Sequence, residues 1–224
     1  MTPYTLLRSR RKTLAIHITK TAKVEVRAPL KMPKADIERF VNAKQDWIDK
    51  HWAVRANCLA QKATFALRYG DCVLMQGREC LILSNSTKKA YFDDGCFYLP
   101  PDLSPEAAQQ AVIQIYRQTA KTILPAKVAN YAMHMNITPR AVKINNAKTR
   151  WGSCSSINNL NFSWRLVMAD EAAIDYVVVH ELAHIFEHNH SNRFWAIVAH
   201  MLPDYTVCQL RLKALQRRLD TENW

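Results

Sequence analysis

The sequence is poor in glycine, has no paired cysteine motif and has no long apolar run. Only four glycines accompany nine prolines in 224 residues, which excludes collagen-like and low-complexity architectures. None of the six cysteines forms a CxxC pair, so a cysteine-based zinc finger is excluded and we expect reduced, mostly buried thiols. No segment approaches the roughly 20 apolar residues that span a bilayer, and the first residues, MTPYTLLRSRRK, do not resemble a signal peptide. We therefore expect a cytoplasmic protein with no membrane partner.

The chain is basic, and the positive charge is concentrated at the N-terminal end. It is 49% hydrophobic and 22% charged, with a formal net charge of +12. Residues 1–62 carry 14 Lys or Arg against 5 Asp or Glu, a net of +9. This excess has two interpretations: a solvated face that maintains solubility, or a surface for weak nucleic-acid contact.

The first hundred residues alternate between strand and helix patterns. Apolar residues at every second position predict a hairpin from Leu14–Ile18 and Val24–Pro29. Apolar residues spaced by 3, 4 and 7 predict one amphipathic helix from Pro33 to about residue 60, with its tryptophans in the core. Residues 63–100 favour short strands, and Asp94-Gly95 predicts a tight hairpin turn.

The rest of the chain is mainly helical. Ser104-Pro105 begins a predicted helix that runs to about residue 134, with a kink or break near Pro125. Alternation then predicts strands through 141–168. Helices are expected at three further segments, the first two with N-caps Asp170 and Ser191: 171 to about 188, 192–201, and about 206–219. The order of elements predicts an α+β fold in one compact body with a β-rich N-terminal lobe.

The residues that carry chemistry form an HExxH sequence, His180-Glu-Leu-Ala-His184, within a predicted helix. Residues four apart share one helix face, so the two imidazoles can bind one metal ion. Glu181 is one step around the helix and can reach a water molecule without ligating the metal. The apolar run before His180 places the helix in the core, where histidines need partners.

A catalytic zinc usually has three protein ligands, and five side chains are candidates for the third: Glu187, His188, His190, His200 and Asp204. On a continuous helix His188 would lie about 12 Å from His180, too far to share one ion. His190 fits better, since Asn189 can end the helix and allow the chain to turn back. Its spacing equals that of the metzincin sequence HExxHxxGxxH, with Glu187 at the glycine position. A thermolysin-like third ligand would have to be Glu222, close to the terminus.

Several stretches together resemble the YgjP-like family of zinc metallopeptidases, which is related to the SprT-like peptidases. They are Arg150–Ser155 (RWGSCS), Asn161–Leu166 (NFSWRL), Val179–His184, Asn189–Trp195 (NHSNRFW), Pro203–Tyr205, and Arg10–Leu14 with Val24–Pro29. The resemblance implies a single domain over 1–224, with a β-rich basic lobe at 1–103. It also implies a zincin-like helical metallopeptidase core at 104–224, in which a β-hairpin precedes the HExxH helix.

By position, the resemblance implies His180, His184 and His190 as ligands of one Zn²⁺ ion and Glu181 as the catalytic base. The expected activity is hydrolysis of peptide bonds in a peptide or unfolded-protein substrate. The attacking water would be bound to the ion that the three histidines hold, and Glu181 would activate it. Four side chains remain open as donors to the oxyanion: Arg165, His188, His200 and Tyr205.

Two alternatives to this activity remain. One is a nucleic-acid-associated basic protein with a structural metal, which would need a fourth ligand such as His200 or Cys208. The other is a scaffold that binds metal without cleaving, which the intact Glu181 argues against.

Overall fold

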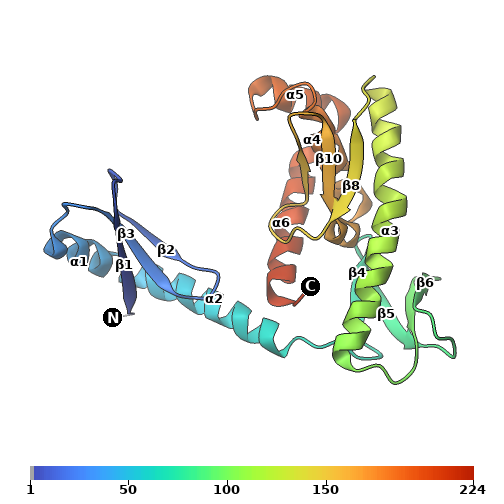
Figure 1. Cartoon of the computed structure of the whole chain (residues 1–224), viewed down its shortest axis with the longest axis horizontal. Coiled ribbons are helices and arrows are strands. Elements are labelled where there is room, and N and C mark those ends of the chain that lie inside the picture. The colour runs from blue at the N-terminus through green and yellow to red at the C-terminus, as the bar shows by residue number, and fades with distance from the viewer. Residues whose placement is uncertain (1–2) are drawn as a thin grey trace. The chain divides into compact units, whose positions relative to one another are not determined.

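The computed structural model describes residues 3–224 and has an α+β fold, as expected (Figure 1). It divides into two compact units. The smaller unit is Met1–Phe65 with Arg218–Trp224, and the larger unit is Ala66–Arg217. The boundary between these units lies at residue 65, whereas the predicted basic lobe ends at residue 103. That the whole chain forms one domain stays a prediction. Within the described residues, no helix is long and apolar enough to cross a membrane.

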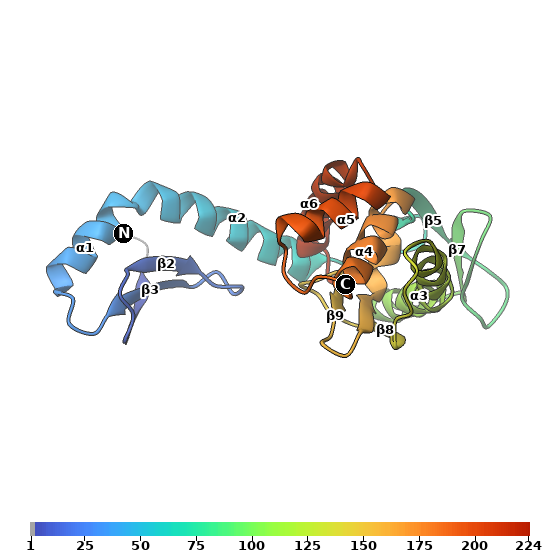
Figure 2. The same cartoon turned by 90° about the horizontal axis from the view of Figure 1, so that it is seen from above.

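The smaller unit is a three-stranded sheet with helices on one face (Figure 2). Its elements are β1 (Tyr4–Ser9), β2 (Ala15–Ile18), β3 (Val24–Pro29), α1 (Lys34–Ala43) and α2 (Gln45–Thr64). The central strand β3 pairs antiparallel with β2, which confirms the predicted hairpin, and parallel with β1. The side chains of Val24, Val26 and Ala28 pack with Ile37, Val41 and Ile48 of the helices.

The predicted single helix from Pro33 is wrong, because the chain breaks at Lys44 between α1 and α2 (φ −112°, ψ 12°). Beyond the break, Ile48 is the one buried residue of α2. The predicted burial of the tryptophans is also wrong: Trp47 and Trp52 are 42% and 40% exposed. Trp47 stacks on His51, and the indole of Trp52 donates a hydrogen bond to the carbonyl of Ala22.

The larger unit begins with a four-stranded sheet of order β4-β5-β7-β6. Its strands are β4 (Cys72–Met75), β5 (Arg78–Ser84), β6 (Tyr91–Asp93) and β7 (Cys96–Leu99). Asp94 and Gly95, with φ of 44° and 73°, make the predicted tight turn between β6 and β7.

The long helix α3 (Pro105–His134) follows, and the Ser104 hydroxyl caps it by accepting from the N–H of Ala107. The predicted break at Pro125 does not occur, because α3 continues through it. Buried side chains on both sides of the proline, including Ala120, Leu124 and Val128, hold this helix in the core.

A second sheet lies beside α3 (Figure 1) and has the order β8-β10-β9, from β8 (Ala141–Asn145), β9 (Gly152–Cys154) and β10 (Asn159–Ser163). Strand β10 pairs antiparallel with β9, as predicted, and β9 is an edge strand. The predicted strand over 164–168 is wrong: Trp164–Met168 form a 3₁₀ helix, η1. All five of its residues are buried, so the apolar and polar alternation does not mark two faces.

Three helices follow: α4 (Glu171–Ala183), α5 (Asn192–Met201) and α6 (Tyr205–Thr221), of which only the last turn of α6, from Arg218, belongs to the smaller unit. The predicted N-caps are confirmed, since Asp170 accepts from the N–H of Ala173 and Ser191 from that of Phe194. Helix α4 ends at Ala183 rather than near residue 188, because the N–H groups of Phe186 and Glu187 both turn back to the Ala183 carbonyl.

The cysteines are free thiols, as expected, but their predicted burial is wrong for most of them. Only Cys80 and Cys208 are buried, and Cys72 is exposed. Cys72 is the first residue of the short strand β4 and is exposed, although Val73 and Met75 of the same apolar run are buried.

Candidate metal centre

Helix α4 brings two histidines of the HExxH sequence to the same face. His180 and His184 are one turn apart, and their ring centroids are separated by 5.0 Å at an interplanar angle of 85°. Both side chains are partly buried, because the preceding residues of α4, Val177–Val179, lie in the core. Core packing of α4 therefore fixes the direction in which the two imidazoles point.

The third imidazole comes from the segment between α4 and α5. Nε2 of His190 lies 3.1 Å from Nε2 of His180, and the rings of His190 and His184 are 4.7 Å apart. One nitrogen from each of the three rings lies within 4.8 Å of the others. The early end of α4 makes this possible, because a helix continuing to residue 188 would carry the chain away from His180.

The three imidazoles fit a divalent metal ion of the zinc type. Zn–N bonds of about 2.0–2.1 Å in a tetrahedral site place two ligand nitrogens about 3.3 Å apart, close to the 3.1 Å between His180 and His190. Burial first, and then the neighbouring imidazoles, lower the pKa of His180 to about 3, and burial also lowers the pKa of His184. These rings therefore stay neutral at pH 7 and keep a lone pair for a metal ion.

Each ligand-type ring on α4 has a polar partner at its other nitrogen. Nδ1 of His184 lies 3.1 Å from the Glu187 carbonyl, and Nδ1 of His180 lies 3.4 Å from the Tyr176 hydroxyl. Gln209 of α6 donates to that hydroxyl at 3.0 Å. Such contacts orient a ring and place its proton on the nitrogen that faces away from the metal. Sequence reasoning missed Tyr176 and Gln209, although Tyr176 is one helical turn before His180.

Aromatic side chains of α5 hold the cluster from the side. The buried ring of Phe194 lies 4.6–4.9 Å from all three imidazoles. Trp195 stacks on His190, and Tyr205 stacks on Trp195. Phe194 is a core residue, and this packing orients His190, which itself is exposed.

Glu181 lies in a narrow space against the edge strand β9. Its side chain is buried, and its carboxylate accepts a hydrogen bond from the backbone of Cys154. A Cβ atom at Gly152 would lie 2.6 Å from Oε1 and Cγ of Glu181, closer than real contacts allow. Glycine at position 152 is therefore what allows the carboxylate to sit beside the histidines, a requirement that sequence reasoning did not find.

Burial raises the pKa of Glu181 to about 8, while the charge of Arg150 and the hydrogen bond from Cys154 lower it. A cation held by the neighbouring imidazoles would lower it further. The carboxylate can thus take up and release a proton near neutral pH, which suits a general base or acid.

The sequence as a whole matches one known family. A family model described as "YgjP-like, metallopeptidase domain" matches residues 12–215. The chain belongs to the YgjP-like family. It is a metallopeptidase, a metal-dependent hydrolase of peptide bonds, as the resemblance implied.

Two solved structures are similar to part of this YgjP-like peptidase. One is the metallopeptidase zymogen of Pyrococcus abyssi abylysin, 20% identical, covering 44% of this chain and 93% of its own with a TM-score of 0.35. The other is the metallopeptidase zymogen of Methanocaldococcus jannaschii jannalysin, 23% identical, covering 42% and 95% with a TM-score of 0.36. No curated protein matches the chain.

The other candidate ligands of the YgjP-like peptidase are not part of this cluster. Within residues 3–224, His180, His184 and His190 are the only group of three or more possible ligands gathered this closely. Cys208 is buried with its thiol on the Ala172 carbonyl, and Glu222 pairs with Arg218. A fourth protein ligand, which a closed structural site would need, is thus not part of this group.

Proposed function

We propose that this YgjP-like peptidase holds one Zn²⁺ ion with His180, His184 and His190 and uses Glu181 as the general base. The observation that carries the proposal is the convergence of three imidazole nitrogens within 4.8 Å, next to a buried carboxylate on the same helix. Three ligands leave one coordination position open, as catalytic zinc sites require.

The proposed mechanism assigns the proton transfers to Glu181. When bound, the ion supplies Lewis acidity, which acidifies water and polarises a carbonyl group. Glu181 takes a proton from the water that attacks the peptide carbonyl, and the C–O bond forms. Glu181 then gives this proton to the leaving nitrogen as the C–N bond breaks.

The proposed substrate is an extended peptide or an unfolded protein. Strand β9 is the edge of its sheet and carries Gly152 and Cys154 against Glu181. A peptide that pairs with this edge would be held by main-chain hydrogen bonds across the imidazoles. Such binding depends on backbone groups, so we expect little sequence specificity.

The four predicted oxyanion donors differ in their positions. Arg165 is 4% exposed, and its guanidinium donates to the side chain and carbonyl of Asn146 and to the carbonyl of Ala147. These contacts support a structural role for Arg165. Tyr205 contacts the cluster through Trp195, whereas His200 lines a separate cavity. We favour Tyr205 among these three.

The proposal is tested by Glu181→Gln, which keeps the shape of the side chain and removes the base. We expect cleavage of a reduced, unfolded protein to fall by about 10²–10⁴-fold, with zinc stoichiometry by elemental analysis unchanged. His190→Ala is the companion variant and should lose zinc as well as activity. Cleavage by Glu181→Gln at the parent rate would refute the assignment of the base.

A second candidate function is weak nucleic-acid contact by the basic segment 1–62. The exposed Trp47 and Trp52 favour it, because bases stack on aromatic rings that stand among cationic side chains.

The free thiols support the proposed cytoplasmic location.

A further inference from the structure

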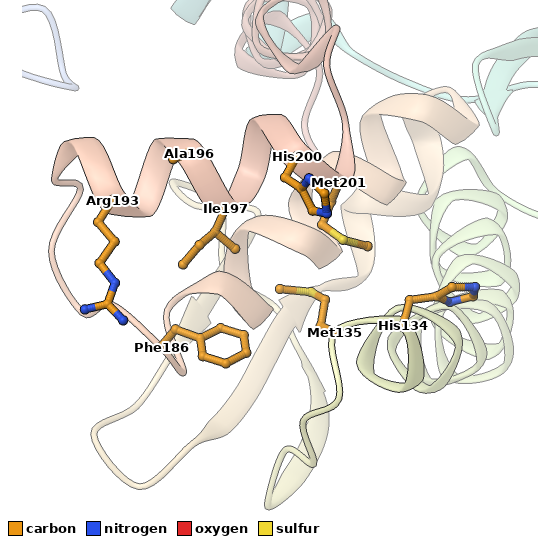
Figure 3. A pocket seen from close by; sticks show the side chains of 8 residues that line it. All are labelled: His134, Met135, Phe186, Arg193, Ala196, Ile197, His200 and Met201. Atoms are coloured by element: carbon orange, nitrogen blue, oxygen red, sulfur yellow. The ribbon is translucent and has the colours of Figure 1, made fainter.

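A cavity of about 540 Å³ opens on the larger unit, between the end of α3, the segment after α4, and α5 (Figure 3). Its apolar lining consists of Met135, Phe186, Ala196, Ile197 and Met201. Figure 3 shows Phe186 and Ile197 facing each other across it. Phe186 is 46% exposed, an unusual position for a phenylalanine. The volume falls within the range of about 300–1,000 Å³ that ligand sites in proteins have.

The polar residues around this cavity are all basic in type. Arg193 stands at one end, and His134 and His200 stand toward the other, while no Asp or Glu lines it. Arg193 makes no ion pair with any residue in 3–224. Its charge therefore favours a ligand that carries a carboxylate beside an apolar group.

The cavity and the imidazole cluster lie on different faces of α5. Phe194 and Trp195 contact the imidazoles, whereas Arg193, Ala196 and Ile197 line the cavity. At 100° per residue these two sets point to opposite sides of the helix. Phe186 also belongs to the segment that connects His184 to His190, so the cavity is separate from the cluster but joined to it by that short segment.

We propose that this cavity is an exosite for the substrate polypeptide, which binds a large apolar side chain of an acidic segment outside the bond that is cleaved. This inference rests on the proposed function of the metal centre. Two methionines in the lining can adapt to apolar side chains of different shape, which suits an unfolded protein better than one fixed metabolite.

The separation of the two sites sets the length of substrate that uses both. A chain that passes around α5 must cross a helix about 10 Å wide, which takes at least about three extended residues. Peptides of four residues or fewer would therefore use the metal centre alone, and longer acidic chains would use both sites.

Binding is measured on the full chain with Glu181→Gln and zinc, so that cleavage does not interfere. The probe is a fluorescein-labelled 12-residue peptide with a Leu-Met-Phe core flanked by glutamates, followed by anisotropy. We expect Arg193→Glu to weaken binding about fivefold and Ala196→Trp, which fills the cavity, to weaken it at least as much. Leu210→Trp and Lys213→Glu, exposed positions on α6, are matched controls and should bind as the parent does.

The same variants in the active enzyme give the second measurement. Arg193→Glu should raise KM for an unfolded acidic protein about fivefold and leave kcat/KM for a four-residue peptide unchanged. An equal loss on both substrates would show that the cavity is only structural and would overturn the exosite.

Three other results would also overturn it: parent-level binding by Arg193→Glu and Ala196→Trp, equal binding of a lysine-flanked peptide, or binding of phosphatidylglycerol vesicles but not of the peptide. If the probe binds as expected while the parent cleaves no peptide, the exosite stands and the proposed catalytic assignment fails.

Discussion

At Gly152 the site has no room for a side chain. Because any Cβ there would meet the Glu181 carboxylate at 2.6 Å, Gly152→Ala must displace either Glu181 or strand β9. A shift of about 1 Å at a reacting group can cost about 10²-fold in rate, so we expect kcat/KM to fall by about that factor while zinc stays bound. Ser153→Ala, the neighbouring control, should keep most activity. Full activity in Gly152→Ala would mean that Glu181 is not held where the structure has it.

Arg150 gives a prediction for the pH profile. Its charge lowers the pKa of Glu181, so Arg150→Gln should raise that pKa, and the base would be protonated at a higher pH. The acidic limb of kcat/KM should therefore move to higher pH, with a large loss at about pH 6 and little change at about pH 9. Arg150→Lys keeps the charge and should leave the limb in place. A limb that does not move in Arg150→Gln would contradict the electrostatic link.

Residue spacing predicted the site better than residue environment. The four-residue spacing of His180 and His184 sufficed to place two imidazoles together, and the spacing also favoured His190, which the resemblance then implied as a ligand. Gly152 and Tyr176 could not be found this way, because their roles depend on the approach of β9 and on a hydrogen bond to His180. The helix break at Lys44 was missed for a similar reason, since no strong breaker residue marks it.

At the scale of elements, the sequence predicted the N-caps of helices but not the residues at which elements end. Ser104, Asp170 and Ser191 all cap helices as predicted, because a short polar side chain before an apolar pattern is a local signal. The end of α4 and the 3₁₀ helix η1 were not predicted. Apolar residues continue past both points, and only tertiary packing decides where each element stops.

The cap of α5 is expected to matter for metal binding as well as for stability. Ser191 directly follows His190, and its hydroxyl accepts a hydrogen bond from the N–H of Phe194. Ser191→Ala should cost about 1 kcal/mol in the free energy of unfolding and also weaken zinc binding, measured by chelator competition. Ser104→Ala removes the cap of α3 and is the control, with a similar loss of stability and unchanged zinc affinity. Equal zinc affinity in both variants would separate the cap from the metal centre.

At the scale of the whole molecule, the positive charge is distributed unevenly along the chain. The net of +9 in residues 1–62 should give retention on single-stranded DNA at low salt that falls steeply as salt rises. Trp47→Ala should weaken this retention at least about fivefold if bases stack on the exposed ring. The buried Ile48→Ala is unsuitable as a control, so the exposed Val54→Ala on the same helix is used instead. Absence of retention at low salt would dismiss the nucleic-acid function.

Two of the three imidazoles come from one rigid helix, while the third arrives ten positions after the first, from an irregular segment. An ion shared by all three would act as a staple that closes this short loop and removes conformations from it. Emptying of the centre and local opening of the segment between α4 and α5 then become a single event. A nick made by an external protease in that segment would report the loss of metal directly, without any assay of turnover.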